Sequence, residues 1–163
     1  MKIEPLTRQA FKPFGEVLEM EGAQRIAINQ NFAQRFNTLA HVDVSDEGGS
    51  VNISIATANP RPQPIAIKMM ERHPLGSQIF YPLEDQPWLV LVCGDPHDLN
   101  SYRAFQATGQ QGINYAKGAW HHPLLVLKPS RFFIVDRKGP GNNLEETVLA
   151  TIIEFDTSSA SID

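Results

Sequence analysis

The alternation of apolar and polar positions along the chain predicts many short β-strands and a single convincing helix. Near the start, Thr7 stands before Gln9, Ala10 and Phe11, where its hydroxyl can cap a first helical turn. Pro13 disfavours helical geometry in the residue before it, so this helix is expected to end there. The helix is therefore a short N-terminal appendage to a β structure.

Two segments, 36–44 and 51–55, alternate apolar and polar residues with the period of two that is typical of a half-buried strand. The segment 88–93 is apolar throughout, as expected of a central strand that is covered on both faces. Between 25 and 35 the sequence is rich in Asn and Gln without a strong period, and we expect irregular structure there. Further strands are predicted from Ile65, from Gln78, and at 103–105, 124–127, 132–135 and 148–155.

Short strands separated by turns every eight to twelve residues or so predict an all-β fold, either a sandwich or a jelly-roll barrel. A chain of 163 residues fits a single domain, 1–163, in which the Ser-rich tail 157–163 is expected to be frayed. The edge strands of such a fold expose unpaired backbone N–H and C=O groups unless another element covers them. Pairing across a two-fold axis is a common solution, so we expect a homodimer.

Charge and composition narrow the classes of partner. The formal net charge is −4 and there is no long run of Lys or Arg, which argues against a nucleic-acid footprint or an anionic membrane surface. No stretch resembles a signal peptide or reaches the roughly 18 apolar residues of a membrane span, so a soluble, cytoplasmic protein that acts on a small molecule is expected. The single cysteine, Cys93, excludes an intrachain disulfide and is interpreted as a core residue.

The candidate catalytic side chains lie in two segments that are far apart in the sequence. In an extended strand Glu71 and His73 project from one face, the same face as Ile67 and Met69. The next strand brings Gln78, and His121 lies far along the chain. These residues fit a set of polar groups at the mouth of a barrel; the alternative is that Glu71 and His73 are only a solvated strand end before a turn.

The spacing Glu71-x-His73-x4-Gln78 resembles the first motif of the cupins, and Gly118-x-x-His121 resembles the second. The resemblance implies a cupin-like jelly-roll barrel with a short N-terminal helix added. The cupin pattern has His at the position of Glu71 and Glu at the position of Gln78. These departures leave open whether a metal is tightly held, because a neutral amide is a poor ligand.

Three longer segments resemble the ureidoglycolate lyases, once called ureidoglycolate hydrolases, over nearly the full length of the chain. They are Pro13–Leu18, Glu71–Gln78 and Ala116–Leu124. The resemblance implies an enzyme that cleaves ureidoglycolate to glyoxylate and urea in allantoin degradation, a part of purine catabolism that frees nitrogen.

Within that resemblance, His121 is expected to transfer protons, with Glu71, His73 and Gln78 as the complementary catalytic residues. Its neighbour His122 should face the other side of the strand and serve structure. If a metal is bound, the same four residues are its expected ligands; the resemblance indicates nickel first and manganese second. The candidates for substrate binding are Lys68, Arg72, Ser77 and Trp120.

The carboxylate of the substrate needs a cation or backbone donors, and the sequence does not choose among them. Lys117 and Arg131 are available as well, and so are the backbone N–H groups at Gly76 and Gly118. The sequence alone also leaves open two functions that are not enzymatic. One is a non-catalytic cupin module that binds a small organic acid, and the other is a β-domain without pocket chemistry; an oxygen-using cupin enzyme is a weaker enzymatic rival.

Overall fold

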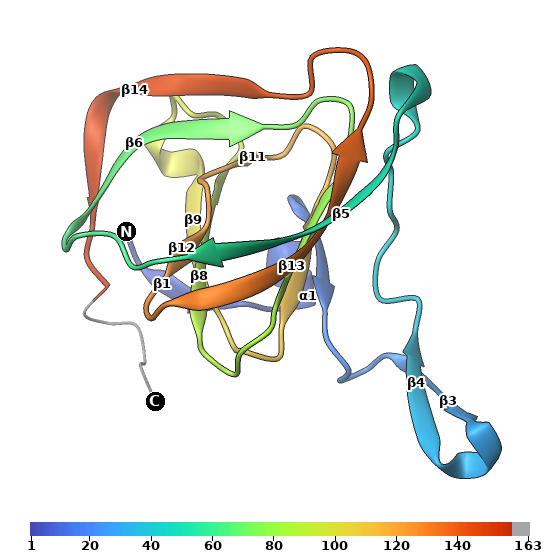
Figure 1. Cartoon of the computed structure of the whole chain (residues 1–163). Coiled ribbons are helices and arrows are strands. Elements are labelled where there is room, and N and C mark those ends of the chain that lie inside the picture. Colours follow the sequence, from blue (N-terminus) through green and yellow to red (C-terminus); the bar gives the residue numbers. More distant parts are fainter. Residues whose placement is uncertain (158–163) are drawn as a thin grey trace.

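The computed structural model describes residues 1–157 and shows an almost entirely β fold with two main sheets (Figure 1). No helix in this part of the chain is long and apolar enough to cross a membrane. The helical elements are α1 (Arg8–Phe11) and the short 3-10 helices η1 (Asn29–Asn31), η2 (Asp46–Gly48) and η3 (Leu99–Ser101). The strands are β1 (Ile3–Pro5), β2 (Gly15–Leu18), β3 (Gln24–Ile28), β4 (Ala33–Asn37), β5 (Ser50–Ala58), β6 (Ile65–Arg72), β7 (Gln78–Pro82), β8 (Trp88–Cys93), β9 (Tyr102–Ala107), β10 (Gly112–Tyr115), β11 (Trp120–His121), β12 (Leu125–Val126), β13 (Ser130–Lys138) and β14 (Glu145–Phe155).

The larger sheet has seven strands in the order β1-β9-β8-β11-β6-β14, with β12 also paired to β8. The second sheet has five strands in the order β2-β10-β7-β13-β5, and β3 with β4 forms a separate hairpin. The strand pairs are antiparallel, apart from the parallel pair of β1 and β9. The prediction of an all-β fold with a short N-terminal helix is confirmed, and the two sheets are the layers that a jelly-roll barrel requires.

The inner core fills the space between the two sheets. It includes Val90 and Val92 from β8, and Phe80, Ile113 and Phe132 from the second sheet. The alternate residues of β8, Leu89, Leu91 and Cys93, pack in an outer cluster on the other face of the same strand. All six residues of β8 are buried, so the prediction of a central strand covered on both faces is confirmed. Burial raises the pKa of the Cys93 thiol to about 12, which fits a packing role.

The short helix forms as predicted, because the side chain of Thr7 accepts a hydrogen bond from the backbone N–H of Ala10. The predicted strand positions 51–55, 65–72, 78–81, 88–93, 103–105, 132–135 and 148–155 lie in observed strands. Of the predicted strand 124–127, only Leu125–Val126 forms a strand, β12. The sequence did not indicate β1, β2 or β10. Most of the tail predicted to be frayed, 157–163, lies outside the described residues; the Thr157 hydroxyl donates to Gln63 Oε1 at 3.0 Å.

The prediction of irregular structure at 25–35 is wrong. The segment forms the β3–β4 hairpin, which projects from the barrel as a separate arm (Figure 1). Its turn contains Asn29, Gln30 and Asn31 with φ values of 50°, 56° and 73°, a left-handed conformation that Asn tolerates better than most residues. The turn residues therefore determine the structure of this segment, whose apolar pattern is too weak to indicate a strand.

The prediction of a strand over 36–44 is also wrong beyond Asn37, where β4 ends. The backbone of Asp43 bonds to Ser77 instead of to a neighbouring strand. The N–H of Asp43 donates to the Ser77 hydroxyl at 2.9 Å, and its carbonyl accepts from the Ser77 N–H at 2.7 Å. These bonds hold the segment against the barrel as an extended connection to β5.

Candidate functional site

The site begins with the pairing of β6 and β11, two strands that lie far apart in the sequence. Their register places His121 directly opposite Glu71, while the other side of β11 pairs with β8, where His121 lies opposite Val92. Directly opposite residues share a face of a sheet, and Val92 belongs to the inner core. Glu71 and His121 therefore both face the interior between the two sheets.

Strict alternation along β6 would place Ile67 on the same face as Glu71, and this expectation is wrong. Ile67 and Met70 both pack in the outer cluster, although they are three residues apart. The phase of the strand therefore changes between them, where the pairing with β14 also shifts its register. Because of this change, Glu71 faces inward while Met70 faces outward.

A tight turn brings β11 into this place. The N–H of Ala119 donates to the carbonyl of Ala116 at 3.0 Å, and the N–H of Gly118 donates to the carbonyl of His73 at 2.9 Å. Gly118 has a φ of 77°, which a glycine adopts without strain. The turn thus ties the end of β6 to Gly118, three residues before His121.

The side chains of Glu71, His73 and His121 meet at one point. One ligand atom from each, a carboxylate oxygen or an imidazole nitrogen, lies within 4.8 Å of the other two. His121 Nε2 is 3.5 Å from Glu71 Oε1, and the centroids of the two imidazole rings are 5.3 Å apart. The structure thus places these three candidate residues next to one another.

The hydrogen bonds of both rings define which nitrogen carries the proton. His73 Nδ1 lies 2.7 Å from the carbonyl oxygen of Asn143, and His121 Nδ1 lies 2.9 Å from that of Ala119. A carbonyl oxygen only accepts, so each Nδ1 must donate its hydrogen. In a neutral ring Nε2 then carries a lone pair, and both lone pairs belong to the group that contains Glu71.

Within residues 1–157, three buried polar atoms of this region have no hydrogen-bond partner. They are His73 Nε2, His121 Nε2 and Gln78 Oε1. At 3.5 Å, the contact of His121 with Glu71 is too long for a good hydrogen bond. A buried polar atom without a partner costs about 1–3 kcal/mol, so three together indicate a place that is built to be completed by a ligand.

Gln78 and Tyr115 form the wall beside the cluster. They are directly opposite each other on β7 and β10, and Tyr115 belongs to the inner core. The Tyr115 ring stacks on His121 with centroids 3.9 Å apart and an angle of 15°. The sequence did not indicate Tyr115, because β10 is short and lacks a clear alternation; the ring nevertheless fixes the plane of the His121 imidazole.

The surroundings of Glu71 and Tyr115 shift the pKa of each group. Burial by itself would raise the pKa of Glu71, but its interactions with His121, and after it with His73 and His122, outweigh burial and lower that pKa. Burial and the charge of Glu71 raise the pKa of the Tyr115 phenol, which stays protonated. These shifts favour an ionised Glu71 carboxylate and a protonated Tyr115 phenol.

His122 differs from His121 although it is its neighbour. Burial lowers the pKa of His122 to about 4, and its Nδ1 lies 2.7 Å from the carbonyl oxygen of Pro123. Its backbone N–H donates to the carbonyl of Leu91 on β8. Burial thus favours the neutral form of His122, and its two hydrogen bonds anchor the start of the loop after β11.

Two imidazole nitrogens and a carboxylate oxygen are a donor set that suits a divalent transition-metal ion. The amide oxygen of Gln78 is a fourth atom of the hard type that such an ion accepts. The unpartnered state of both Nε2 atoms and of the amide oxygen supports this fit. No cysteine takes part, so the set differs from a closed structural zinc site.

The residues predicted to bind the substrate lie apart from this point. Trp120 alternates away from His121, and the Arg72 guanidinium lies over its ring at 4.7 Å and pairs with Glu145 at 2.6 Å. Lys68 is exposed, and the Ser77 hydroxyl accepts a hydrogen bond from the connection before β5.

The other candidate donors for the substrate carboxylate are engaged too. Lys117 pairs with Asp43 at 3.0 Å and with Asp46 at 2.7 Å, and Arg131 pairs with Glu84 at 2.6 Å. The N–H of Gly118 is taken by His73. The geometry therefore brings the predicted catalytic residues together without adding a cation from these candidates.

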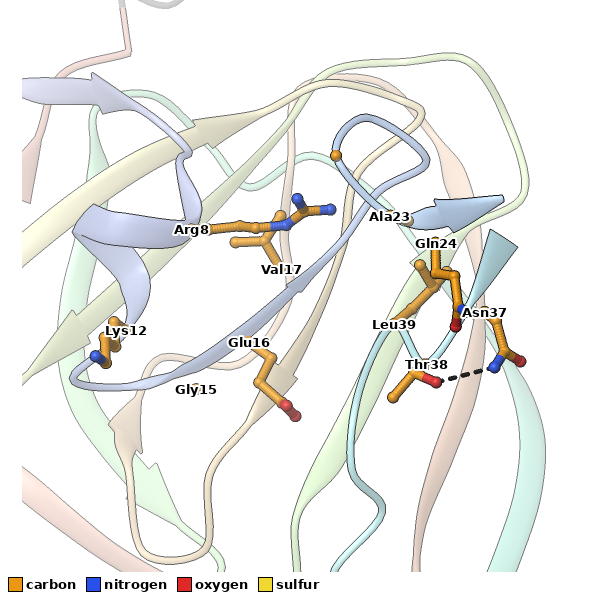
Figure 2. Close-up of a pocket in the computed structure, with 11 residues that line it drawn as sticks. Arg8, Lys12, Gly15, Glu16, Val17, Ala23, Gln24, Asn37, Thr38 and Leu39 are labelled. Atoms are coloured by element: carbon orange, nitrogen blue, oxygen red, sulfur yellow. Dashed lines mark hydrogen bonds between the residues drawn. The ribbon is translucent and has the colours of Figure 1, made fainter. Parts of the chain in front are cut away.

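A separate groove of about 450 Å³ lies between β2 and the base of the hairpin (Figure 2). One side is formed by Arg8, Glu16 and Val17, and the opposite side by residues such as Gln24 and Leu39. None of the four predicted catalytic residues lines it. The groove is therefore a feature of how the hairpin joins the barrel and not the candidate reaction site.

Comparisons with known proteins agree on one family. The family model for ureidoglycolate lyase matches residues 1–156. A ureidoglycolate lyase of Burkholderia mallei (strain NCTC 10229) is 52% identical over 149 residues, which cover 90% of this chain and 87% of the relative. Ureidoglycolate lyase 1 of Rhizobium meliloti (strain 1021) is 53% identical over 148 residues, with 90% and 87% covered, and a ureidoglycolate lyase of Burkholderia cepacia is 45% identical over 168 residues, with 100% and 95% covered.

Among solved structures, the chain is similar to a Bacillus subtilis oxalate decarboxylase that contains Mn(II) centers. The TM-score is 0.40 and the sequence identity is 13%. The similar region covers 66% of this chain but only 27% of that protein.

Proposed function

The chain belongs to the ureidoglycolate lyase family, and from this premise we propose that Glu71, His73, Gln78 and His121 form its reaction centre. The protein is an enzyme, a lyase that cleaves ureidoglycolate to glyoxylate and urea. The family implies a place in allantoin degradation within purine catabolism. The alternative of a non-catalytic module that binds an organic acid gains no support from these relatives.

One observation carries the assignment of the site. The buried imidazole of His121 and the partly buried imidazole of His73 are both fixed through Nδ1 to backbone carbonyls. Among the described residues their Nε2 atoms have no hydrogen-bond partner, and both lie within reach of the partly buried Glu71 carboxylate. A structural histidine such as His122 needs no such arrangement. Groups held ready in this way lose little free energy to reorganisation when a substrate binds.

The reaction is the collapse of a carbinolamide and needs one base and one acid. The base removes the proton of the hydroxyl group, the electron pair of the O–H bond forms the carbonyl of glyoxylate, and the C–N bond breaks. The electron pair of that bond leaves with the urea nitrogen, which takes up a proton. No water is consumed, so the base can return the proton that it has accepted.

We assign the proton transfer to His121. Its Nε2 lone pair is available, its ring plane is set by Tyr115, and the Glu71 carboxylate 3.5 Å away stabilises the imidazolium that forms. Such a pair speeds a reaction by about a hundredfold to ten-thousandfold. His73 and the amide of Gln78 are then left to orient the hydroxyl and ureido groups by hydrogen bonds.

A divalent cation fits the same group of atoms, with nickel as the first candidate and manganese as the second. His73, His121, Glu71 and Gln78 would hold it, and the bound ion would supply Lewis-acid stabilisation of the alkoxide. A nitrogen that holds a cation does not accept a proton. The metal and His121 as a base are therefore alternatives that one experiment separates.

The test incubates the purified protein with ureidoglycolate, with and without a chelator, and follows urea, glyoxylate and ammonia together. Equal amounts of urea and glyoxylate support the lyase reaction, whereas ammonia in place of urea contradicts it. Activity that survives chelation supports His121 as the base. Activity that is lost and then restored by nickel or manganese assigns the Nε2 atoms to the metal.

We propose four further properties of the protein: its substrate contacts, its domain organisation, its location and its oligomeric state. The substrate contacts of Lys68, Arg72, Ser77 and Trp120 are tested by the affinity of glyoxylate for their alanine variants. We propose that residues 1–163 form one domain, since the two sheets share an inner core. A cytoplasmic location fits the absence of a helix suited to cross a membrane in residues 1–157. We also propose a homodimer.

A further inference from the structure

The inner face of the second sheet carries a pair of polar side chains on β13 and β5. Phe132 and Ile134 of β13 belong to the inner core, and Asp136, two residues further along, faces the same way. Asn52 of β5 lies directly opposite Asp136, and its amide donates to Asp136 Oδ1 at 2.9 Å. Ala56, on the same face of β5 as Asn52, packs against the inner core. The pair of Asn52 and Asp136 therefore faces the interior of the barrel.

The same row of inward-facing residues continues into the candidate reaction site. The register of β13 and β7, continued by one residue beyond its last pair, brings Asp136 beside Gln78. Gln78 in turn lies opposite Tyr115 on β10, and the ring of Tyr115 stacks on His121. Neighbouring strands are roughly 5 Å apart, so the backbone of Asp136 is about 10 Å from that of Tyr115. A substrate that reacts at His121 can therefore extend along this row toward Asp136.

The carboxylate of Asp136 can accept more hydrogen bonds than the fold gives it. Among residues 1–157 it forms no ion pair, and the amide of Asn52 is the donor that its side chain meets. An ionised carboxylate offers about four lone-pair sites and has no hydrogen to donate. A ligand that binds at Asp136 must therefore supply N–H or O–H groups.

The adjacent amide of Gln78 also needs a donor. Gln78 Oε1 is buried, and within the described part of the chain no hydrogen-bond partner reaches it. Gln78 and Asp136 thus present two neighbouring acceptors to the interior. The negative charge of Asp136 would repel the carboxylate of the substrate, so this end of the site does not suit that group. It suits a neutral group that carries several N–H donors.

Solvent reaches this end of the interior along β5. Ser54 lies between Asn52 and Ala56 on the inward face of the strand, and yet it is exposed. The strands β5 and β14 are the last strands of their sheets, and no hydrogen-bonded pairing joins them in residues 1–157. A small molecule can therefore enter the interior beside Asn52 and Asp136.

We propose that Asp136, oriented by Asn52, binds the ureido group of the substrate and thereby selects ureides for the reaction at His121. This role of Asp136 rests on the proposed function, because it assigns the leaving-group end of the same site. A ureido group presents one N–H of its inner nitrogen and one N–H of its terminal amide side by side. A carboxylate accepts two such parallel hydrogen bonds through its two oxygens. The remaining N–H of the terminal amide is left for Gln78 Oε1, which has no other donor among the described residues.

The test measures the binding of two probes by titration calorimetry. Ureidoacetate has the ureido group and the carboxylate of the substrate without its hydroxyl, and glycolate has the hydroxyl and the carboxylate without the ureido group. Asp136→Asn should weaken the binding of ureidoacetate at least about tenfold and change that of glycolate by less than about twofold. Asp98→Asn is the matched control and should leave both affinities unchanged. Asp98 also accepts a hydrogen bond from an uncharged donor, the N–H of Asn100, but it lies in the loop before β9.

A second variant, Asn52→Ala, keeps the carboxylate and removes the donor that orients it, so it should also weaken the binding of ureidoacetate and not that of glycolate. Circular dichroism and thermal melting of each variant show that the fold is intact. An unchanged affinity for ureidoacetate in Asp136→Asn, or equal weakening of both probes, overturns this role of Asp136.

The binding measurements need no turnover, so they are read separately from the release of urea and glyoxylate. A protein that releases no urea, but whose affinity for ureidoacetate depends on Asp136, contradicts the proposed function and supports the ureido contact. A protein that releases urea, but binds ureidoacetate equally well as Asp136→Asn, supports the proposed function and overturns the ureido contact.

Discussion

Replacing His121 with alanine tests the proposed chemistry against a control that the chain itself provides. His121 and His122 are neighbours, both are buried, and both hold a backbone carbonyl through Nδ1. Only His121 belongs to the group with Glu71 and His73. Because residue type, burial and carbonyl bond are shared, a difference between the two alanine variants reports on the site and not on packing.

The expected magnitudes follow from the contacts that each change removes. Both variants lose a hydrogen bond of about 1 kcal/mol, and His121→Ala also loses the stack on Tyr115, which contributes about 0.5–1.5 kcal/mol. With the cavity that is left, we expect each to lose about 2–4 kcal/mol of unfolding free energy. Turnover should fall at least about a hundredfold in His121→Ala and by no more than about threefold in His122→Ala.

The assay measures glyoxylate release at saturating substrate, and urea denaturation of both variants supplies the stability control. A hundredfold loss corresponds to about 3 kcal/mol in the activation free energy, well above the scatter of such measurements. An unchanged rate in His121→Ala removes this residue from the mechanism. Equal losses in both variants would mean that activity follows stability, which contradicts a chemical role for His121.

Three further predictions address the neighbours of His121. Glu71→Gln should weaken the binding of nickel or manganese at least about tenfold, because it removes the negative charge of the group. Titration calorimetry measures this affinity, and Glu154→Gln on β14 is the control that should leave it unchanged. Equal affinities in the two variants would refute the site. Tyr115→Phe should retain turnover and Tyr115→Leu should lower it by about twofold to tenfold, since only the second loses the stack. An equal loss in both variants would assign the role to the hydroxyl. Acidification should destabilise the fold. Burial lowers the pKa of His122 from 6.5 to about 4, so the unfolded chain binds more protons than the folded chain between these values, and about 3 kcal/mol of unfolding free energy is lost as the pH falls through this range. The lowered pKa of Glu71 adds a further loss below pH 4.5. Urea denaturation from pH 7 to pH 4 with chelator present measures this loss, which His122→Gln should reduce; an identical pH profile in that variant would contradict the assignment.

The sequence by itself determined the elements whose signals are local. The run Trp88–Cys93 is apolar at every position and can only be a strand covered on both faces, and Thr7 caps a helix through an atom three residues away. The four candidate catalytic residues could also be named in advance, because their spacing in two segments resembles a family pattern. Side-chain type and spacing are properties of the chain alone, so features that depend on them do not change with the way in which distant segments pack.

Only the tertiary structure decided which way each strand faces and what each ring nitrogen does. The phase change in β6 turns Glu71 inward, and it depends on pairing with β14, more than seventy residues later. The tautomer of His73 depends on the carbonyl of Asn143, and the ring plane of His121 depends on Tyr115. The pattern of β5 predicted a strand correctly, but alternation is symmetric between two faces, and only the packing of distant strands chooses which face becomes the core.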